Sequence, residues 1–300
     1  MLTSNIQSLI YLFHMPLFFF LSGLLFHDCD NYVHKKVSQL IIPLFAFSII
    51  TLPIKYIERS ILQEACYLNL SYLSLQFYNI PLWFCISLFT ISCIFWGVIK
   101  RCWDIRIQTT FIILISFCGL VLSYFKLFLP LYLSQSLLAF PFYAMGNFSS
   151  TIKTNWKVAI ISIFILIYAQ VSHVNTNISE LIVNINPLLY FIPALSGIYI
   201  IIHISKSCEE KGCKVNLLTF LGRNSLYIFA LHWPFITILQ RTNEIIGIDK
   251  HIGNVIIFIT VIILSLCIGE LLAYYFPKNF QPISRKELSA DSGIEHSKRK

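Results

Sequence analysis

Long apolar stretches restrict the fold of this chain more than any other feature of its sequence. Nine of them are close to the length of about 20 residues that an α-helix needs to cross a bilayer. They lie at residues 6–26, 37–57, 79–99, 109–129, 131–148, 156–174, 187–204, 224–241 and 254–276. The stretches lack the alternation of apolar and polar residues that is typical of a transmembrane β-barrel. We therefore expect an all-α, polytopic transmembrane helical bundle of about nine spans with no soluble domain.

The composition agrees with a membrane protein. Hydrophobic residues make up 57% of the 300 residues and charged residues only 12%, about half of the share of roughly 25% in soluble domains. One membrane domain is expected over residues 1–276, followed by a charged, disordered cytoplasmic tail at 277–300. The spans at 109–129 and 131–148 are separated only by the corner Leu129-Pro130, which predicts a tight helical hairpin.

The distribution of basic residues predicts the orientation in the membrane. If the N-terminus lies outside and each span reverses direction, 17 of the 22 Lys and Arg residues lie inside. That excess is the positive-inside signal of membrane proteins, so the net charge of +8 does not imply a nucleic-acid partner. The N-terminus is expected outside and the C-terminus inside. Because no basic anchor precedes the first span, the chain is also expected to begin one helix late, a tenth helix being absent.

Several kinds of functional site are not expected. The nine cysteines form no metal-type pairs, and Cys208 and Cys213 have four residues between them and no neighbouring histidine pair. No metal site is therefore predicted. The phosphate-binding loop of an ATP-driven pump is missing, as are the nucleophile elbow, the H-E-x-x-H motif and the dinucleotide fingerprint.

Two histidines lie inside apolar spans. His14 belongs to FHMPLFFFLSGLLF at 13–26, and His232 to LGRNSLYIFALHWPF at 221–235. Each lies about 12 Å from one edge of its span at a helical rise of about 1.5 Å per residue. In a hydrocarbon core of about 30 Å the two imidazoles can lie within about 6 Å of each other in depth, which permits a shared site. The alternative for each is a histidine hydrogen-bonded to a neighbouring backbone or hydroxyl group.

Other polar and aromatic residues also have two interpretations. Arg223 and Lys36, at cytoplasmic helix ends, either hold the phosphates of an anionic cofactor or follow the topology rule. Asn224 and Ser225 stand at a helix start, where capping alone explains them. Trp83 either anchors its span at the interface or stacks on a sugar. Glu270, in the last span, either pairs with a basic group, stays neutral or relays protons in a transporter.

Four motifs resemble those of the integral-membrane acyltransferase 3 family. They are FHMPLFFFLSGLLF at 13–26, Lys35-Lys36 with LIIPLFAF at 40–47, PLWFCISLF at 81–89 and LGRNSLYIFALH at 221–232. Their order and spacing are most similar to the fucose 4-O-acetylase-like branch. The family pattern falls on the following residues: His14, Ser22, Gly23, Lys36, Pro43, Trp83, Asn224, Ser225 and His232.

The resemblance implies a ten-helix enzyme of the bacterial cytoplasmic (inner) membrane. It would move an acetyl or related acyl group from acyl-CoA to a sugar hydroxyl of a cell-surface polysaccharide or lipid-linked glycan. Acetyl-CoA or another acyl-CoA would be a co-substrate, with no resident cofactor. Such a transfer needs a base, donors to the oxyanion and anchors for the CoA phosphates. We expect the following roles: His14 and His232 catalytic, Lys36 and Arg223 at the CoA, and Trp83, Asn224 and Ser225 at the acceptor.

The sequence departs from the family pattern at its start. The family opens with a helix that carries a basic residue and, eleven positions later, a histidine, whereas only thirteen residues precede His14 and none is basic. The chain is then a shortened enzyme, an inactive relative, or a non-catalytic partner in polysaccharide assembly. A secondary transporter or flippase of lipid-linked glycan is a further alternative, with Glu270 and the histidines as a proton path. Against it stands the lack of an internal repeat.

Overall fold

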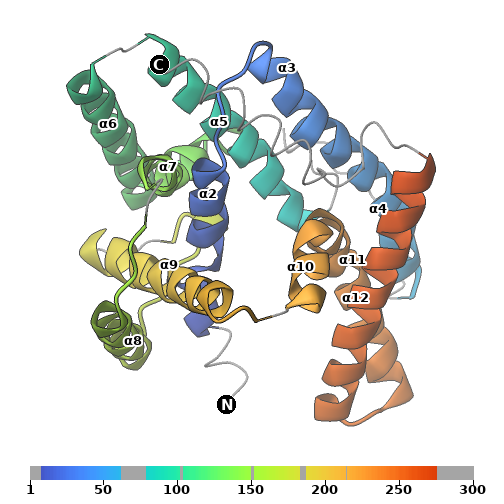
Figure 1. The fold of residues 1–300 in the computed structure, drawn as a ribbon. Coiled ribbons are helices and arrows are strands. Elements are labelled where there is room, and N and C mark those ends of the chain that lie inside the picture. Colours follow the sequence, from blue (N-terminus) through green and yellow to red (C-terminus); the bar gives the residue numbers. More distant parts are fainter. Residues whose placement is uncertain are drawn as a thin grey trace. The chain divides into compact units, whose positions relative to one another are not determined.

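The computed structural model describes residues 8–61, 79–101, 104–149, 152–182, 187–213 and 215–275. Within these ranges the chain is helical and contains no β-strand, only an isolated bridge between Asn177 and Ile182 (Figure 1). The all-α prediction is therefore confirmed. The helices are α2 (His14–Leu24), α3 (Tyr32–Lys36), α4 (Ile42–Ile61), α5 (Trp83–Arg101), α6 (Ile105–Tyr124), α7 (Leu133–Phe148), α8 (Trp156–Val171), α9 (Pro187–Glu210), α10 (Asn216–Arg223), α11 (Ser225–Ile246) and α12 (Lys250–Tyr275). Shorter helical turns are η1 (Val37–Ile41), η2 (Ile80–Leu82), η3 (Pro130–Tyr132) and η4 (Ile178–Glu180).

Several of these helices have the length and the apolar surface of membrane spans. Five helical stretches in the described ranges are long and apolar enough to cross a bilayer: Tyr32–Ile54, Ile80–Val98, Ile105–Tyr124, Pro187–Glu210 and His251–Tyr275. Phe117 on α6, Phe164 on α8 and Phe258 on α12 are all more than 60% exposed, as side chains that face lipid tails would be. The chain is an integral membrane protein. The count of nine spans stays a prediction, and the predicted tail at 277–300 lies outside the described residues.

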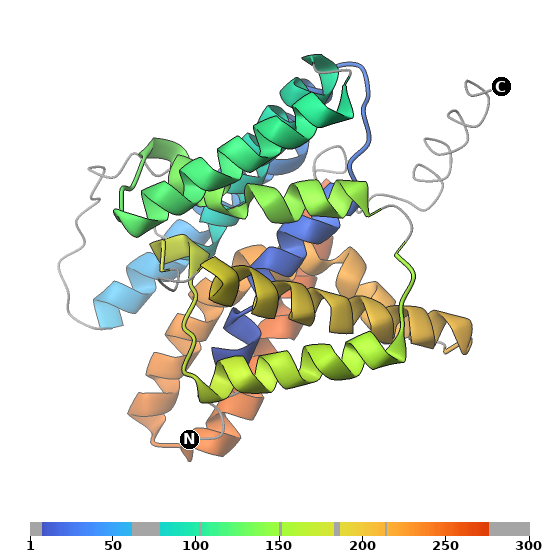
Figure 2. The same cartoon turned by 90° about the vertical axis from the view of Figure 1, so that its left-hand side faces the viewer.

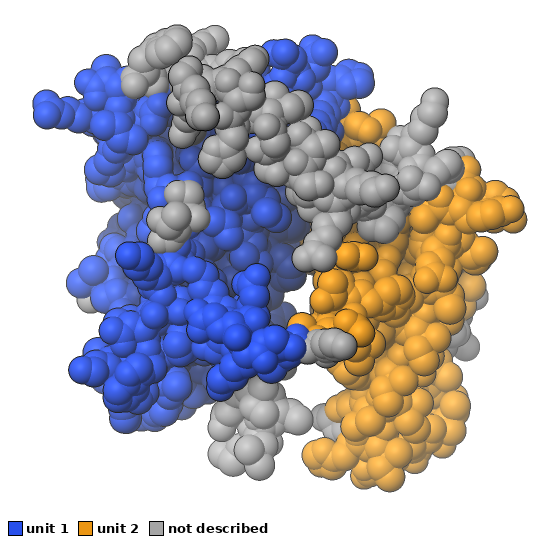
Figure 3. Space-filling model, viewed as in Figure 1, with its two compact units in different colours: residues 1–36, 83–214 blue, residues 37–82, 215–300 orange. Residues whose placement is uncertain are grey.

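The helices form two compact units (Figure 3). Unit 1 comprises residues 1–36 and 83–214, with α2, α3 and α5 to α9. Unit 2 comprises residues 37–82 and 215–300, with α4 and α10 to α12. The chain passes between the units at Lys36-Val37, Leu82-Trp83 and Lys214-Val215, and each unit is described by itself.

Glycines bring the helices of unit 1 into backbone contact. A methyl group added to Gly23 on α2 would overlap the carbonyl of Tyr143 on α7, and one added to Gly146 on α7 would overlap the carbonyl of Phe20 on α2. The two helices touch through their backbones, as small residues permit between membrane helices (Figure 1). In the Ser-Gly pair of the first motif, Gly23 thus has a packing role. The Ser22 hydroxyl donates a hydrogen bond to the carbonyl of Phe18 in the same helix, at 2.8 Å.

A glycine on α6 lies against the peptide of α7 whose carbonyl loses its usual donor to a proline. Pro141 inside α7 has no N–H for the carbonyl of Leu137, one turn earlier. Gly119 on α6 lies directly against this Leu137 peptide, where a side chain would not fit. On the other side of unit 1, α8 and α9 run side by side (Figure 2).

The predicted hairpin between the fourth and fifth spans is present, with a longer connection than the sequence indicated. The helix α6 ends at Tyr124, and residues 125–132 lead into α7. The Ser134 hydroxyl closes this connection because it donates to the carbonyl of Leu127 (2.6 Å) and accepts from the Leu129 N–H (3.0 Å). The longer connection leaves backbone groups outside the helices, and the buried Ser134 satisfies two of them.

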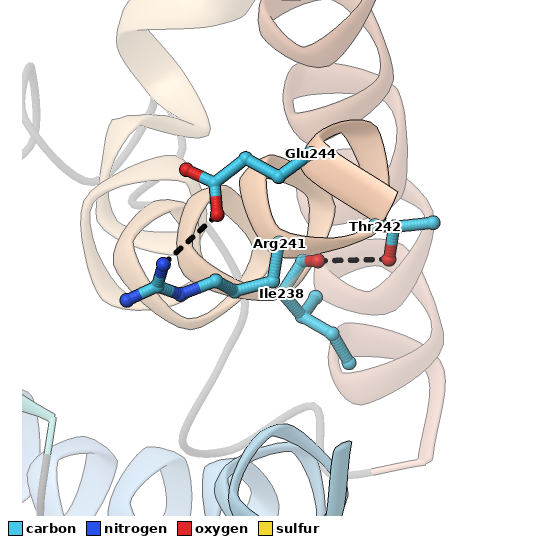
Figure 4. Close-up of polar contacts among 4 residues, drawn as sticks. All are labelled: Ile238, Arg241, Thr242 and Glu244. Atoms are coloured by element: carbon cyan, nitrogen blue, oxygen red, sulfur yellow. Dashed lines mark hydrogen bonds and ion pairs between the residues drawn. The ribbon is translucent and has the colours of Figure 1, made fainter. Parts of the chain in front are cut away.

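In unit 2, α11 contacts both α4 and α12. Tyr227 on α11 lies with its ring 6.3 Å from that of Phe47 on α4, and it covers Gly269 on α12, where no side chain would fit. The far end of α11 has its own polar contacts (Figure 4): Arg241 pairs with Glu244 at 2.9 Å, and Thr242 donates to the carbonyl of Ile238 at 2.9 Å. This ion pair is exposed, so its contribution to stability is small.

Candidate active site

The predicted site residues divide between the two units. Unit 1 contains His14, Lys36 and Trp83, whereas unit 2 contains Arg223, Asn224, Ser225 and His232. The unit 2 residues lie together at the junction of α10 with α11 and on the first turns of α11. A site shared by His14 and His232 stays a prediction.

The imidazole of His232 has a defined orientation on α11. Its Nδ1 atom lies 2.7 Å from the carbonyl oxygen of Phe229 and 3.1 Å from that of Ile228. A carbonyl oxygen only accepts hydrogen bonds, so Nδ1 carries the proton and Nε2 of the neutral ring holds a lone pair. Among the described residues Nε2 has no hydrogen-bond partner. The half-buried His232 is therefore oriented to accept a proton at Nε2.

The residues before His232 join two helices. Asn224 is buried, and its side-chain Nδ2 donates to the carbonyl of Phe220 in α10 at 3.0 Å. Its own carbonyl accepts from the N–H groups of Tyr227 and Ile228 in the first turn of α11. The Asn224 side chain therefore closes the end of α10 and does not cap α11. Arg223 and Ser225, on either side, are both exposed.

His14 stands at the start of α2, where the chain is bent. The turn at Leu12-Phe13 precedes it, and Pro16, in the first turn of α2, has no N–H for the Leu12 carbonyl. The His14 Nδ1 atom lies 3.1 Å from the carbonyl oxygen of Ile10, and its ring stands edge-on to that of Tyr11 at 4.8 Å. His14 and His232 thus bond alike to the carbonyl oxygen four residues earlier, and for both such a backbone bond is the alternative role that the sequence left open.

Lys36 and Trp83 have contacts inside unit 1. The Lys36 ammonium lies over the ring of Tyr32, 5.4 Å from its centroid, and the Trp96 indole stacks on the same ring with the centroids 5.7 Å apart. This cation–π contact holds the half-buried Lys36 at the end of α3. Trp83 is 5% exposed and is covered by the rings of Phe19 and Tyr132. The indole lies in the aromatic core of unit 1, so a sugar would have to displace a neighbouring ring to stack on it.

A comparison with known families places the chain as a whole. One family profile, described as an acyltransferase domain, matches residues 1–274, nearly the whole chain. The chain belongs to the acyltransferase 3 family. No curated protein and no solved structure matches it. The resemblance seen in the sequence motifs is thereby confirmed at the level of the family.

In unit 2, His232 has a ring nitrogen, Nε2, that can accept a proton, as a general base does. Sequence reasoning missed one residue beside it. Asn79, only 1% exposed, donates from Nδ2 to the carbonyl oxygen of Ala230 at 2.7 Å, two residues before His232. The signal in the sequence was Pro234, which has no N–H for that same carbonyl.

Proposed function

We propose that this acyltransferase 3 protein is an O-acyltransferase of the fucose 4-O-acetylase-like branch. It moves an acetyl or related acyl group from acyl-CoA to a sugar hydroxyl of a cell-surface polysaccharide or lipid-linked glycan. In this proposal it crosses the bacterial inner membrane nine times, with the N-terminus outside and the C-terminus inside. The family match and the excess of basic residues in the predicted inner loops support the proposal.

The observation that carries the proposal is the hydrogen bond from His232 Nδ1 to the Phe229 carbonyl. With Nδ1 protonated, Nε2 takes the proton of the sugar hydroxyl while the hydroxyl oxygen attacks the thioester carbonyl carbon. The tetrahedral intermediate then collapses, the carbon–sulfur bond breaks, and the CoA thiolate takes the proton back from the imidazolium. The ring ends in its starting tautomer, and the products are the sugar ester and free CoA.

The acyl-CoA is proposed to approach from the cytoplasmic side, where it is made. Arg223 is exposed one residue before the α10–α11 junction and can form paired hydrogen bonds with a phosphate. Lys36, in unit 1, is the other residue proposed for the CoA, and its ammonium contacts the Tyr32 ring of the same unit. Trp83, Asn224 and Ser225 are the residues proposed for the acceptor, but the Trp83 indole of unit 1 is buried, and a sugar could stack on it only if a neighbouring ring moved. The exposed Ser225 hydroxyl fits this role best, because the Asn224 amide donates to Phe220.

A complementation experiment tests this function with the native acceptor present. A strain of the source organism that lacks the gene receives the wild-type chain, His232→Ala or the control His251→Ala. His251 is an exposed histidine of the same unit, and only its backbone N–H bonds to Asp249. Alkali-labile acyl esters and total glycan are then measured separately on the cell surface.

The proposal expects esters with the wild-type chain and with His251→Ala, and none with His232→Ala, at unchanged glycan amount. If His232→Ala restored the esters fully, the assignment of the base would be wrong. If deletion lowered the amount of surface glycan and left the ratio of esters to the remaining glycan unchanged, the chain would act in transport or assembly of the glycan, and the proposed function would be overturned. The same assay with His14→Ala tests the prediction for the second histidine.

A further inference from the structure

The helix that carries His232 has a gap in its hydrogen bonds. In an α-helix the N–H of each residue bonds to the carbonyl four residues earlier. Pro234 lies inside α11 and has no N–H, so the carbonyl of Ala230 lacks its usual donor four residues later. Ala230 is fully buried in the structure. A buried carbonyl without a donor is costly, and in a membrane helix a neighbouring element has to supply one.

Asn79 supplies that donor from outside the helix. It precedes η2 by one residue, and its Nδ2 atom lies 2.7 Å from the Ala230 oxygen. Its side chain is almost fully buried, and its own Oδ1 atom has no hydrogen-bond partner among the residues that the structure describes. The amide therefore gives one short bond to α11 while its second polar atom stays unsatisfied. Burying an amide costs free energy that an apolar side chain of the same size would not cost, so packing alone does not explain Asn79.

Three consecutive carbonyls of α11, just before His232, accept hydrogen bonds from side chains. The carbonyls of Ile228 and Phe229 accept from the His232 ring, and the next one, that of Ala230, accepts from Asn79. All three belong to the turn of α11 just before the proline. If this turn moved, the ring would lose the carbonyl that keeps the proton on Nδ1.

We propose that Asn79 is a positioning residue for His232. Its amide holds the proline-interrupted turn of α11 in place, and through that turn it keeps the imidazole in the Nδ1–H tautomer with Nε2 as the proton acceptor. The inference rests on the proposed function for its effect on the rate. The tautomer itself does not depend on that function.

A double-mutant cycle tests the proposal, with Asn79→Ala, Pro234→Ala and the two together. Pro234→Ala returns an N–H that can bond to Ala230 within the helix, so the amide of Asn79 becomes redundant. Asn79→Ala alone is expected to lower kcat by about three- to tenfold, the scale of one net hydrogen bond, with the KM for acyl-CoA unchanged. In the Pro234→Ala background the same substitution is expected to change kcat less than twofold.

A second readout needs no activity. The purified chain with ¹⁵N-labelled histidine gives imidazole signals for its eight histidines, and the signal missing from His232→Gln identifies His232. The signal is expected to show the Nδ1–H tautomer in the wild-type chain, a mixture of tautomers in Asn79→Ala, and the Nδ1–H tautomer again in the double variant.

An unchanged tautomer in Asn79→Ala would overturn the proposal, as would a loss of kcat that is equal in both backgrounds. Should Asn79→Ala fail to fold while the double variant folds, Asn79 would have a structural role only, and the proposal would again be wrong. If instead the tautomer responds as expected while no variant transfers an acyl group, the positioning by Asn79 stands and the proposed function fails.

Discussion

The contact between α2 and α7 leads to a quantitative prediction for Gly23→Ala. An added Cβ atom would lie 2.7 Å from the carbonyl carbon of Tyr143 and 3.0 Å from its Cα atom, whereas ordinary contacts begin at 3.4 Å. Both atoms belong to the backbone of a helix, so no side chain can move aside. The two helices would have to separate by more than about half an ångström, and such overpacking costs about 1–3 kcal/mol.

A second substitution tests the same contact from the other side. In Gly146→Ala the added atom would lie 2.9 Å from the carbonyl carbon of Phe20 and 3.0 Å from the nitrogen of Leu24. A similar loss of about 1–3 kcal/mol is expected. Because both substitutions separate the same pair of helices, their combined effect should be smaller than the sum of the two.

Gly97→Ala on α5 is the matched control for both. It is a helical glycine of the same unit with no atom within 4 Å of an added Cβ. The exchange should be neutral or stabilise the helix by up to about 1 kcal/mol, because alanine has the higher helix propensity. Unfolding of the purified chain in mixed micelles, followed by circular dichroism over a denaturing-detergent titration, gives the three free energies. Equal stability of Gly23→Ala and Gly97→Ala would refute the close contact between α2 and α7.

Three further predictions concern orientation, the donor and the helix junction. Orientation can be tested with a membrane-impermeant thiol reagent on intact cells. A cysteine in place of Lys126 should be labelled from outside, and one in place of Lys157 only after the membrane is opened. The reverse pattern would contradict the orientation. Arg223→Met should raise the KM for acyl-CoA by about tenfold or more, the value of one hydrogen bond to a charged group, with kcat unchanged. A change in kcat alone would argue against a phosphate contact. Asn224→Ala should destabilise unit 2 by about 0.5–1.5 kcal/mol, the net value of one hydrogen bond, because the Phe220 carbonyl loses its side-chain donor and keeps the backbone N–H of residue 224. Ser225→Ala, at an exposed position, should leave the unfolding midpoint unchanged.

The helical fold was predictable because hydropathy alone specifies it. Within a bilayer the backbone has to satisfy its own hydrogen bonds, so a long apolar stretch can only be a helix. The ends of the helices were harder to predict. The span expected at 37–57 belongs to a helical stretch that begins at Tyr32, and this stretch includes the charged Lys36, whose ammonium lies over the Tyr32 ring.

The contacts between helices were outside the reach of the sequence pattern. Gly23 belongs to a recognisable motif, but Gly146, on the helix it packs against, comes 123 positions later and belongs to none of the four motifs. The same holds for the candidate site. His232 was identified from its place in an apolar span, whereas the bond from Asn79 to Ala230 joins residues 151 positions apart. A proline inside a helix signals a carbonyl without its usual donor, but not which residue will supply one.

The most direct test of the account follows the acyl group itself. The purified chain is mixed with acetyl-CoA labelled in the acetyl carbonyl and with lipid-linked glycan extracted from the strain that lacks the gene. The account predicts that label moves into an alkali-labile sugar ester, that one CoA is released for each ester formed, and that His232→Ala lowers the rate by about 100-fold or more, the scale of general base catalysis. Label that stays on CoA with the wild-type chain, or an unchanged rate with His232→Ala, would contradict it.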